Sequence, residues 1–264
     1  MNKLVRPKKH LGQHFLRDAN IARQVANSLT GHGGYSQILE VGPGTGALTH
    51  WLLQNGDYQY TGMEVDADSM SYLLKRYGGD KGRFLQQDIL ACNVAELMHQ
   101  KPFAIIGNFP YNISSQILFK ALELRDRVPE LVGMFQKEVA ERIASKPGNK
   151  VYGILSVLTQ AFFQVEILFY VGEHVFDPPP KVQSAVIRLT RKEVYRLDCH
   201  EGLFFSVVKT AFNQRRKTLR NALKSMQINW DQLPAALPTL RAERLGVQDF
   251  VAITKTLKPP EVRR

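Results

Sequence analysis

The tetrapeptide Asn108-Phe109-Pro110-Tyr111 combines residue types that could hold a planar amine for reaction. It follows the apolar run from Phe103 to Gly107, which has the composition of a buried strand. The side-chain oxygen of Asn108 and a nearby backbone carbonyl can accept the two hydrogens of an exocyclic amino group, while Pro110 fixes φ and donates nothing. Tyr111 offers a ring face on which a base can stack. This chemistry suits methylation of a nucleobase amine; the alternative is an ordinary strand end followed by a turn.

A second set of residues has the spacing of a nucleotide-binding loop. The segment Glu40-Val41-Gly42-Pro43-Gly44-Thr45-Gly46 lies between a predicted strand and a predicted helix. Gly42 and Gly44 would let the backbone approach a ligand closely. Glu64 ends the next predicted strand, and an acidic residue at that distance from the glycines typically binds the hydroxyls of a ribose. No Gly-Lys-Ser/Thr sequence follows the glycines, which excludes a P-loop.

Three further positions could complete this site. Asp88 closes the predicted strand at 83–87, where its carboxylate could accept from an adenine amino group or cap the following turn. The segment 11–16 could fold over a ligand, with His14 supplying polar contacts; the alternative is a solvated histidine. Phe176 precedes a proline-rich stretch that should be stiff and extended. We expect Phe176 to be held out as a second stacking platform, or else to be a buried loop anchor.

The pattern of apolar runs indicates how these residues are positioned. Strands alternate with helical patterns, which predicts a doubly wound α/β domain over residues 1–190, with a basic N-terminal arm at 1–20. The last two strands should form an antiparallel hairpin at one edge of a mostly parallel, seven-stranded sheet. From residue 191 to 264 the periodicity becomes helical and predicts a small all-α domain. The predicted strands are 37–41, 60–63, 83–87, 103–107, 131–135, 165–171 and 184–190.

A cluster of cations marks this C-terminal region. Five cations and no acidic residue fall between positions 212 and 224, on a helix predicted from Leu203 to Met226. A solvated helix face normally mixes both signs, so we favour a surface that contacts phosphates over an ordinary solvated face. The residues predicted to bind RNA are Arg215, Arg216, Lys217 and Arg220.

Composition narrows the class of protein. The 264 residues carry a formal net charge of +11 and a pI of about 9.7, a balance that favours a polyanionic partner such as nucleic acid. Cys92 and Cys199 match no metal-ligand spacing and indicate a reducing compartment. We expect no metal, no signal peptide and no membrane span, because the apolar runs are too short. These features together predict a cytoplasmic protein.

Taken in order, the motifs give the chain a resemblance to the small-subunit (16S) rRNA adenine N6,N6-dimethyltransferases, the KsgA/Dim family. The resemblance implies a Rossmann-like class I fold that uses S-adenosylmethionine (SAM). It further implies a monomer whose substrate is two adjacent adenosines in the 3′-terminal hairpin of small-subunit rRNA, within a pre-assembled subunit. The motifs that carry it are 13–16, 40–46, Glu64, Asp88, 108–111, 176–182 with 184–186, and 212–220.

The family's residue roles can be transferred onto matching positions. One departure is His14, where many members of the family have Asn; an imidazole can still donate or accept a hydrogen bond. The resemblance assigns cofactor binding to His14, Leu16, Gly42, Gly44, Glu64, Asp88 and Asn108. It assigns catalysis and base stacking to Asn108, Pro110, Tyr111 and Phe176.

Two other functions fit part of the same sequence. A large-subunit rRNA adenine methyltransferase of the macrolide-resistance type shares the catalytic motifs, although the segments 176–182 and 212–220 favour the small-subunit group. A mainly non-catalytic ribosome-assembly or RNA-binding factor is the second. The intact 108–111 motif and Glu64 favour retained catalysis over that role.

Overall fold

The structure, a computed structural model, describes residues 5–78 and 83–258. The chain divides into two compact units, residues 1–140 with 165–191 and residues 141–164 with 192–264. The boundary between residues 191 and 192 lies close to the predicted boundary between 190 and 191. The structure groups 141–164 with the C-terminal unit, whereas the prediction placed this segment in the first domain. Helix α7 (Ile154–Phe162) packs against α8 (Glu201–Asn213) and α10 (Val247–Lys255), which joins this segment to the C-terminal unit.

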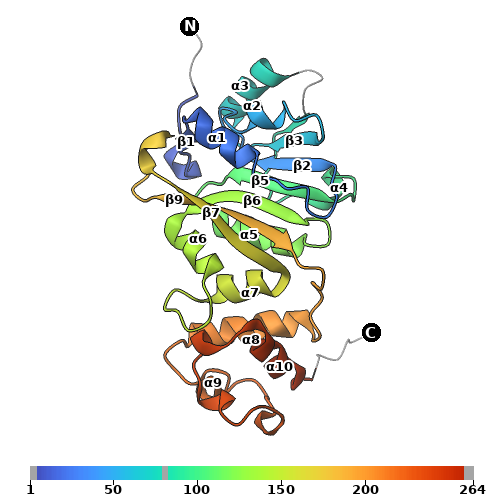
Figure 1. Ribbon diagram of the computed structural model, residues 1–264, viewed down its shortest axis with the longest axis vertical. Coiled ribbons are helices and arrows are strands. Elements are labelled where there is room, and N and C mark those ends of the chain that lie inside the picture. The colour runs from blue at the N-terminus through green and yellow to red at the C-terminus, as the bar shows by residue number, and fades with distance from the viewer. Residues whose placement is uncertain (1–4, 79–82, 259–264) are drawn as a thin grey trace. The chain divides into compact units, whose positions relative to one another are not determined.

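The main sheet of the described residues has seven strands in the order β4-β3-β2-β5-β6-β9-β7. Strands β2 to β6 run parallel to one another, and β9 runs antiparallel to β6. The predicted fold class is confirmed, including two late strands at one edge (Figure 1). The strands are β2 Gln37–Val41, β3 Gln59–Met63, β4 Arg83–Leu85, β5 Phe103–Asn108, β6 Glu130–Gln136, β7 Phe163–Val171 and β9 Ser184–Arg191.

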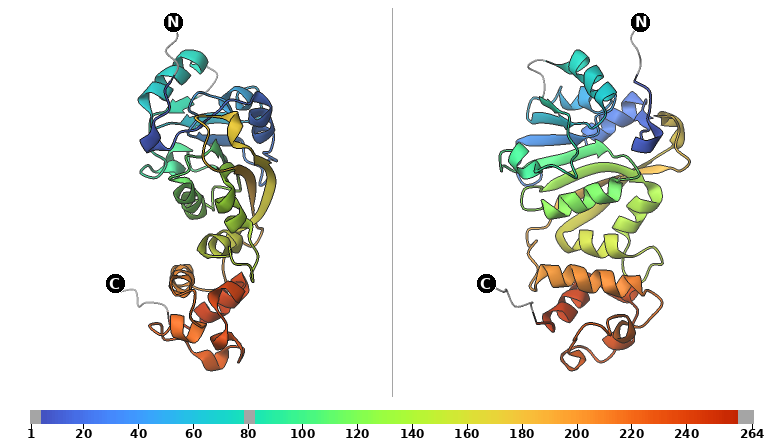
Figure 2. Two further views of the ribbon diagram at one scale, coloured as in Figure 1. Left: turned by 90° about the vertical axis from the view of Figure 1, so that its left-hand side faces the viewer. Right: turned by 180° about the vertical axis from the view of Figure 1, so that it is seen from behind.

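Helices cover both faces of this sheet, as the edge view in Figure 2 shows. Alternate strand residues such as Ile38, Ile106 and Val132 join one core cluster with α1 and α2, while Leu39 and Ile105 between them are buried as well. Burial on both faces is typical of parallel strands. The helices of this unit are α1 Ala19–Ala26, α2 Thr49–Leu52, α3 Ala67–Tyr77, α4 Val94–Leu97, α5 Ser114–Glu123 and the start of α6 Lys137–Ala144.

The order of the strands reverses between β2 and β5. The chain moves outward from β2 to β3 and β4, then returns to β5 on the other side of β2. Ligands of open α/β sheets bind outside the carboxyl ends of the strands at such a reversal. Glu64 follows β3 and Asn108 ends β5, so both predicted site residues lie at this edge.

A small two-stranded sheet lies outside the main one. Strand β1 (Phe15–Leu16) pairs antiparallel with β8 (Phe176–Asp177), and Leu16 lies opposite Phe176. This pairing ties the N-terminal segment to the proline-rich stretch that follows β8. It therefore places two distant motifs of the sequence side by side.

The C-terminal unit is helical, but the long helix predicted from Leu203 to Met226 is wrong. Helix α8 ends at Asn213, and α9 (Leu219–Ala222) begins after an extended Thr218. The backbone nitrogen of Leu219 donates to the carbonyl of Leu240 at 2.8 Å, a partner distant in sequence that local periodicity cannot reveal. Short 3-10 helices follow at Trp230–Gln232, Leu237–Thr239 and Ala242–Arg244.

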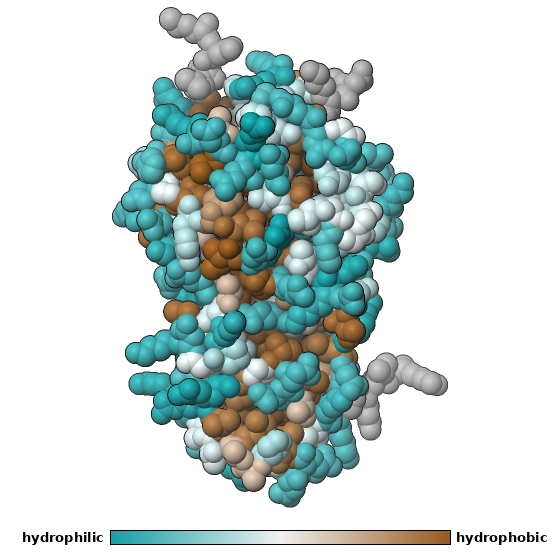
Figure 3. Space-filling model, viewed as in Figure 1, coloured by the Kyte–Doolittle hydropathy of each residue, from teal (hydrophilic) through white to brown (hydrophobic). Residues whose placement is uncertain are grey.

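The described surface is mainly hydrophilic with smaller apolar areas, as one face shows in Figure 3. Among the described residues, no helix has the length and apolar character needed to cross a membrane. Cys92 and Cys199 are free thiols. The large hydrophobic side chains with notable exposure are Val65, Leu74, Val151, Tyr170, Val182, Val194 and Leu240.

Candidate functional site

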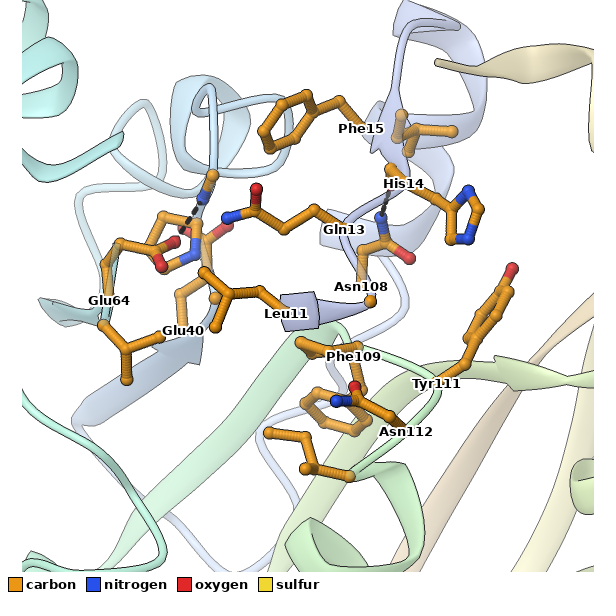
Figure 4. Close-up of a pocket in the computed structure, with 18 of the residues that line it drawn as sticks. Leu11, Gln13, His14, Phe15, Glu40, Glu64, Asn108, Phe109, Tyr111 and Asn112 are labelled. Atoms are coloured by element: carbon orange, nitrogen blue, oxygen red, sulfur yellow. Dashed lines mark hydrogen bonds between the residues drawn. The ribbon is translucent and has the colours of Figure 1, made fainter. Parts of the chain in front are cut away.

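A cavity of about 280 Å³ lies at the carboxyl ends of β2, β3 and β5 (Figure 4). It brings together the segments that the sequence singled out separately, including the glycine loop, the acid after β3 and the motif at 108–111. These segments therefore line one cavity, while the role of each residue stays a prediction. The cavity is lined by 11–16, Glu40, 42–45, Ala47, Glu64, Val65, Asp88, Leu90 and 108–113.

The glycine loop forms the floor of the cavity through its backbone. Gly42 and Gly44 have φ of +70° and +58°, the left-handed region that side chains disfavour. A Cβ atom on Gly44 would also meet the Phe15 ring at 2.9 Å. Both positions therefore require glycine, and the backbone there is open to close approach by a ligand.

Glu64 is held beside this loop by backbone donors. Its side chain accepts from the nitrogen of Gly44 at 2.9 Å and, through the other oxygen, from the nitrogen of Asp66 at 2.9 Å. The residue is 4% exposed, and burial raises the pKa of its carboxyl group. Each carboxylate oxygen can accept a further hydrogen bond, which suits a pair of neighbouring hydroxyl groups.

Asp88 lines the far part of the cavity and also caps a turn. Its Oδ1 accepts from the nitrogen of Leu90 at 2.8 Å, so both predicted interpretations of this residue are compatible with the structure. Val65, which is 47% exposed, and Leu90 add apolar walls. An exposed valine in the wall of this cavity is suited to cover one face of a flat ring. Sequence periodicity missed both residues because it predicts burial and not cavity lining.

The amide of Asn108 has a fixed direction. Its Nδ2 donates to the carbonyl oxygen of His14 at 2.9 Å, which commits the donor end of the amide. The oxygen is the end that can accept a hydrogen from a ligand amine. The carbonyl of Pro110, predicted to point outward, accepts from the nitrogen of Ile113 at 3.1 Å and thus closes a turn. It has one lone pair left for a further contact.

The imidazole of His14 lies on the Tyr111 side of the cavity, away from Glu64 (Figure 4). Its Nδ1 donates to the carbonyl of Pro178 at 2.7 Å, and its ring stacks on Tyr111 with centroids 5.3 Å apart. The hydroxyl of Tyr111 bonds to Ser184, which fixes the tyrosine ring. The backbone carbonyl of His14 also contacts Asn108, and the predicted contact of its side chain with the cofactor stays a prediction. One face of Tyr111 is covered by the histidine.

Phe176 is not held out on its loop, and that prediction is wrong. The residue is 3% exposed and belongs to the core cluster on one face of the sheet. Its pairing with Leu16 across β1 and β8 turns the ring inward. Phe176 is a buried anchor of the proline-rich loop, whereas Leu16 does line the cavity as predicted.

The N-terminal segment is fastened over the cavity by an ion-pair cluster. Lys8 bonds to Asp66 and also to Asp68 at 2.8 Å, and its backbone nitrogen donates to Gln13 at 2.8 Å. The hydrogen bonds to Asp66 and Asp68 raise the pKa of Lys8 to about 12. The predicted basic arm is therefore held to the rest of its unit at Lys8. The first four residues of the predicted arm lie outside the described residues.

Glu40 is a buried acid at the base of the glycine loop. Its Oε2 accepts from the hydroxyls of Thr49 at 2.7 Å and Tyr60 at 2.6 Å. Burial, with the neighbouring Glu64 charge adding to it, raises the pKa of Glu40 to about 7. The protein therefore binds a proton at Glu40 in a pH range where an exposed glutamate is ionised.

This shift predicts how stability depends on pH. Between the ordinary pKa of 4.5 and about 7, the folded protein keeps the Glu40 proton and the unfolded chain releases it, so the free energy of unfolding falls as pH rises. Glu40→Gln should reduce this fall in the free energy of unfolding by on the order of 1–3 kcal/mol across the window. Denaturant unfolding of both proteins at about pH 5 and about pH 8 measures it. Equal slopes for parent and variant would contradict the assignment.

Only some of the predicted RNA-binding residues in the C-terminal unit are exposed and could contact phosphates. Arg215 pairs with Glu243 at 2.8 Å and donates to the carbonyl of Lys150, so it holds two loops of this unit together. Arg216 and Lys217 are exposed in the turn after α8. Arg220 is also exposed, with its guanidinium 5.8 Å from the centroid of the Trp230 ring. Arg215 is thus better described as a structural residue than as a phosphate contact.

Comparison with known proteins extends these observations. The sequence profile of the family described as ribosomal RNA adenine dimethylase matches residues 5–257. A protein of Cytophaga hutchinsonii named ribosomal RNA small subunit methyltransferase A is 53% identical over 253 residues, covering 96% of this chain and 98% of that one.

Two solved structures share the fold. A dimethyladenosine transferase from Plasmodium falciparum aligns with a TM-score of 0.76 and 24% identity, covering 91% of this chain and 96% of that one. A 23S rRNA methyltransferase, ErmE, aligns with a TM-score of 0.72 and 24% identity, covering 92% and 99%. Because the two are named for different activities but align with similar TM-scores, the fold alone does not distinguish between substrates.

Proposed function

We propose that this chain, which belongs to the ribosomal RNA adenine dimethylase family, transfers methyl groups from SAM to the N6 atoms of two adjacent adenosines in small-subunit rRNA. The sequence match to a small subunit methyltransferase at 53% identity supports this substrate over large-subunit rRNA. The orientation of the Asn108 amide beside the cavity is the observation that carries the chemical part of the proposal.

The cavity residues fit SAM. Gly42 and Gly44 give the loop its left-handed backbone turns beside the cavity, Glu64 offers acceptors for ribose hydroxyls, and Val65 with Leu90 can enclose a ring. When bound, SAM supplies a methyl group on a positively charged sulfur. In this proposal Glu64 fixes the ribose and Asp88 accepts from the adenine amine of the cofactor.

Asn108 aims the amine that is methylated. The N6 lone pair of adenine is delocalised into the ring, so the free amine is a poor nucleophile. A hydrogen bond from N6 to Oδ1 of Asn108, with a second to a backbone carbonyl near Pro110, would favour a pyramidal nitrogen and aim its lone pair at the methyl group. The nitrogen would gain the methyl group as the carbon–sulfur bond breaks, and it would then release one proton to solvent. Positioning and fixed dipoles supply most of the acceleration.

The target adenosine must leave its stack to reach Asn108, at a free-energy cost of a few kcal/mol. Tyr111 offsets part of that cost by stacking with the base. Since His14 covers one face of Tyr111, the base uses the other face or displaces the imidazole. The hydroxyl of Tyr111 only orients the ring, through its bond to Ser184.

Methyl incorporation from labelled SAM tests the proposed function. We expect incorporation into small ribosomal subunits that lack the modification, and little into free small-subunit or large-subunit RNA. Preferential labelling of large-subunit RNA would favour the macrolide-resistance type of activity. No labelling of any substrate, with RNA binding retained, would favour a non-catalytic assembly factor.

The proposal extends to the RNA contacts and the form of the enzyme. We infer that the exposed residues Arg216, Lys217 and Arg220 contact phosphates of a pre-assembled subunit, and that the enzyme acts as a monomer in the cytoplasm. The net charge of +11 supports a polyanionic partner of this kind.

The phosphate contacts can be tested by salt dependence. Replacing Arg216 and Lys217 by Gln should reduce the slope of log affinity against log salt by about two, since each contact releases about one counterion. SAM affinity should not change. Arg215→Gln is the matched control, because its ion pair with Glu243 predicts lower stability and a smaller change in slope. An unaltered slope in the double variant would make these residues an ordinary solvated face.

A further inference from the structure

An exposed aromatic ring lies on the edge strand β7 of the main sheet. Tyr170 lies near the end of the edge strand β7 and is 52% exposed. The ammonium of Lys137 lies 5.2 Å from the centroid of its ring. An accessible ring with a neighbouring cation is the combination that binds single-stranded nucleic acid, because bases stack on the ring and phosphates meet the cation.

Hydrogen bonds connect this pair to Tyr111, one of the proposed catalytic residues. The backbone nitrogen of Lys137 donates to the carbonyl of Gln183 at 2.9 Å, and its Nζ donates to the side-chain oxygen of Gln183 at 3.1 Å. The next residue, Ser184, bonds to the hydroxyl of Tyr111. Tyr170 is therefore connected to Tyr111 through Lys137, Gln183 and Ser184, and all five residues belong to the same unit.

The position of Lys137 is not explained by helix stability. Lys137 is the first residue of α6, which follows β6 directly. The N-terminus of a helix carries partial positive charge, so a cation there is unfavourable and an acid would be preferred. An ammonium group has three donor hydrogens, and Gln183 uses one of them. Lys137 therefore places a cation at the N-terminus of α6, where it can bind a phosphate.

We propose that Tyr170 and Lys137 form a subsite for the nucleotide adjacent to the flipped adenosine. The base of that nucleotide stacks on Tyr170, and its phosphate binds Lys137. The subsite would keep the strand from sliding while Asn108 holds the target amine. This inference rests on the proposed function, because the occupant is an RNA strand whose neighbouring adenosine lies at Tyr111.

The competing role is purely structural. The cation–π pair of Lys137 with Tyr170 can stabilise the edge strand β7, and the charge can keep this edge from pairing with another chain. That role predicts a lower melting temperature for Tyr170→Ala with unchanged RNA affinity. The subsite predicts the reverse, so melting curves and binding on the same samples separate the two.

The experiment measures the affinity of unmodified small ribosomal subunits for four variants. Tyr170→Ala should weaken binding about 5- to 100-fold, and Tyr170→Phe should bind like the parent because the ring remains. Lys137→Gln should reduce the salt slope by about one. The matched control is Tyr72→Ala on α3, which removes a tyrosine 5.9 Å from Arg76 at the opposite, β4 edge of the sheet. SAM affinity should be the same in all four.

The subsite is supported if Tyr170→Ala binds subunits more weakly while Tyr170→Phe and Tyr72→Ala bind like the parent. The melting temperature of Tyr170→Ala should then equal that of the parent. Parental affinity of Tyr170→Ala overturns it, whether or not the parent transfers methyl groups. An equal loss in Tyr72→Ala also overturns it, since the effect would not be specific to this edge. The proposed function is judged separately, by methyl transfer in the parent protein.

Discussion

Asn108→Ala lowers the single-turnover rate of methyl transfer by on the order of 10²–10³, while the protein stays folded and binds small subunits normally. The reason is that the alanine variant loses the acceptor that aims the target amine. Asn108→Asp keeps an acceptor of similar size but loses the donor to the His14 carbonyl, so its rate should also fall. Rapid-quench assays on unmodified small subunits, with melting curves on the same samples, measure both effects.

Two comparisons make this result specific. Asn112→Ala removes another amide at the rim of the same cavity and should transfer methyl groups near the parent rate. Tyr111→Ala should lose RNA affinity, because base stacking contributes about 1–3 kcal/mol. Tyr111→Phe should be milder, since it loses only the bond to Ser184. A folded Asn108→Ala protein that reacts at the parent rate would remove this residue from the chemistry.

Glu64→Gln weakens the binding of SAM at least about tenfold, because hydrogen bonds to a charged carboxylate contribute about 1.5–3 kcal/mol each. The amide keeps the volume of the side chain but offers one acceptor group where the carboxylate offered two. It also turns a donor toward the nitrogen of Gly44 or Asp66. Isothermal titration calorimetry with SAM measures the change.

Asp57→Asn is the control for this charge removal, because Asp57 is exposed in the loop just before β3. The pH dependence provides a second check. Since burial raises the pKa of Glu64, parental SAM affinity should begin to fall at a less acidic pH than an exposed glutamate would require. Calorimetry that shows equal affinity for parent and Glu64→Gln would exclude Glu64 from the cofactor site.

The sequence predicted the fold and the location of the site well, for physical reasons. Strands buried on both faces read as apolar runs, and the residues at their carboxyl ends must meet at one edge. Glu64, Asp88 and Asn108 therefore converge as expected. The glycine positions were equally readable, because a positive φ at Gly42 and Gly44 leaves few other residue types.

What the sequence missed depends on contacts between distant segments. Phe176 turns inward because its strand pairs with Leu16, and Arg215 is occupied by Glu243. The imidazole of His14 meets the loop at Pro178, which no local pattern encodes. Lys8 is held by two acids more than fifty residues away. In each case the partner lies beyond the range of helix or strand periodicity.

Nucleoside mass spectrometry of small-subunit rRNA, after reaction of unmodified subunits with SAM, tests the central claim most directly. The parent protein should produce N6,N6-dimethyladenosine at two adjacent adenosines of the 3′-terminal hairpin. The Asn108→Ala variant, at equal occupancy of SAM and of subunits, should leave both adenosines unmodified over the same time. The account is contradicted if the parent leaves this hairpin unmethylated, or if Asn108→Ala yields the same dimethyladenosine at the same rate.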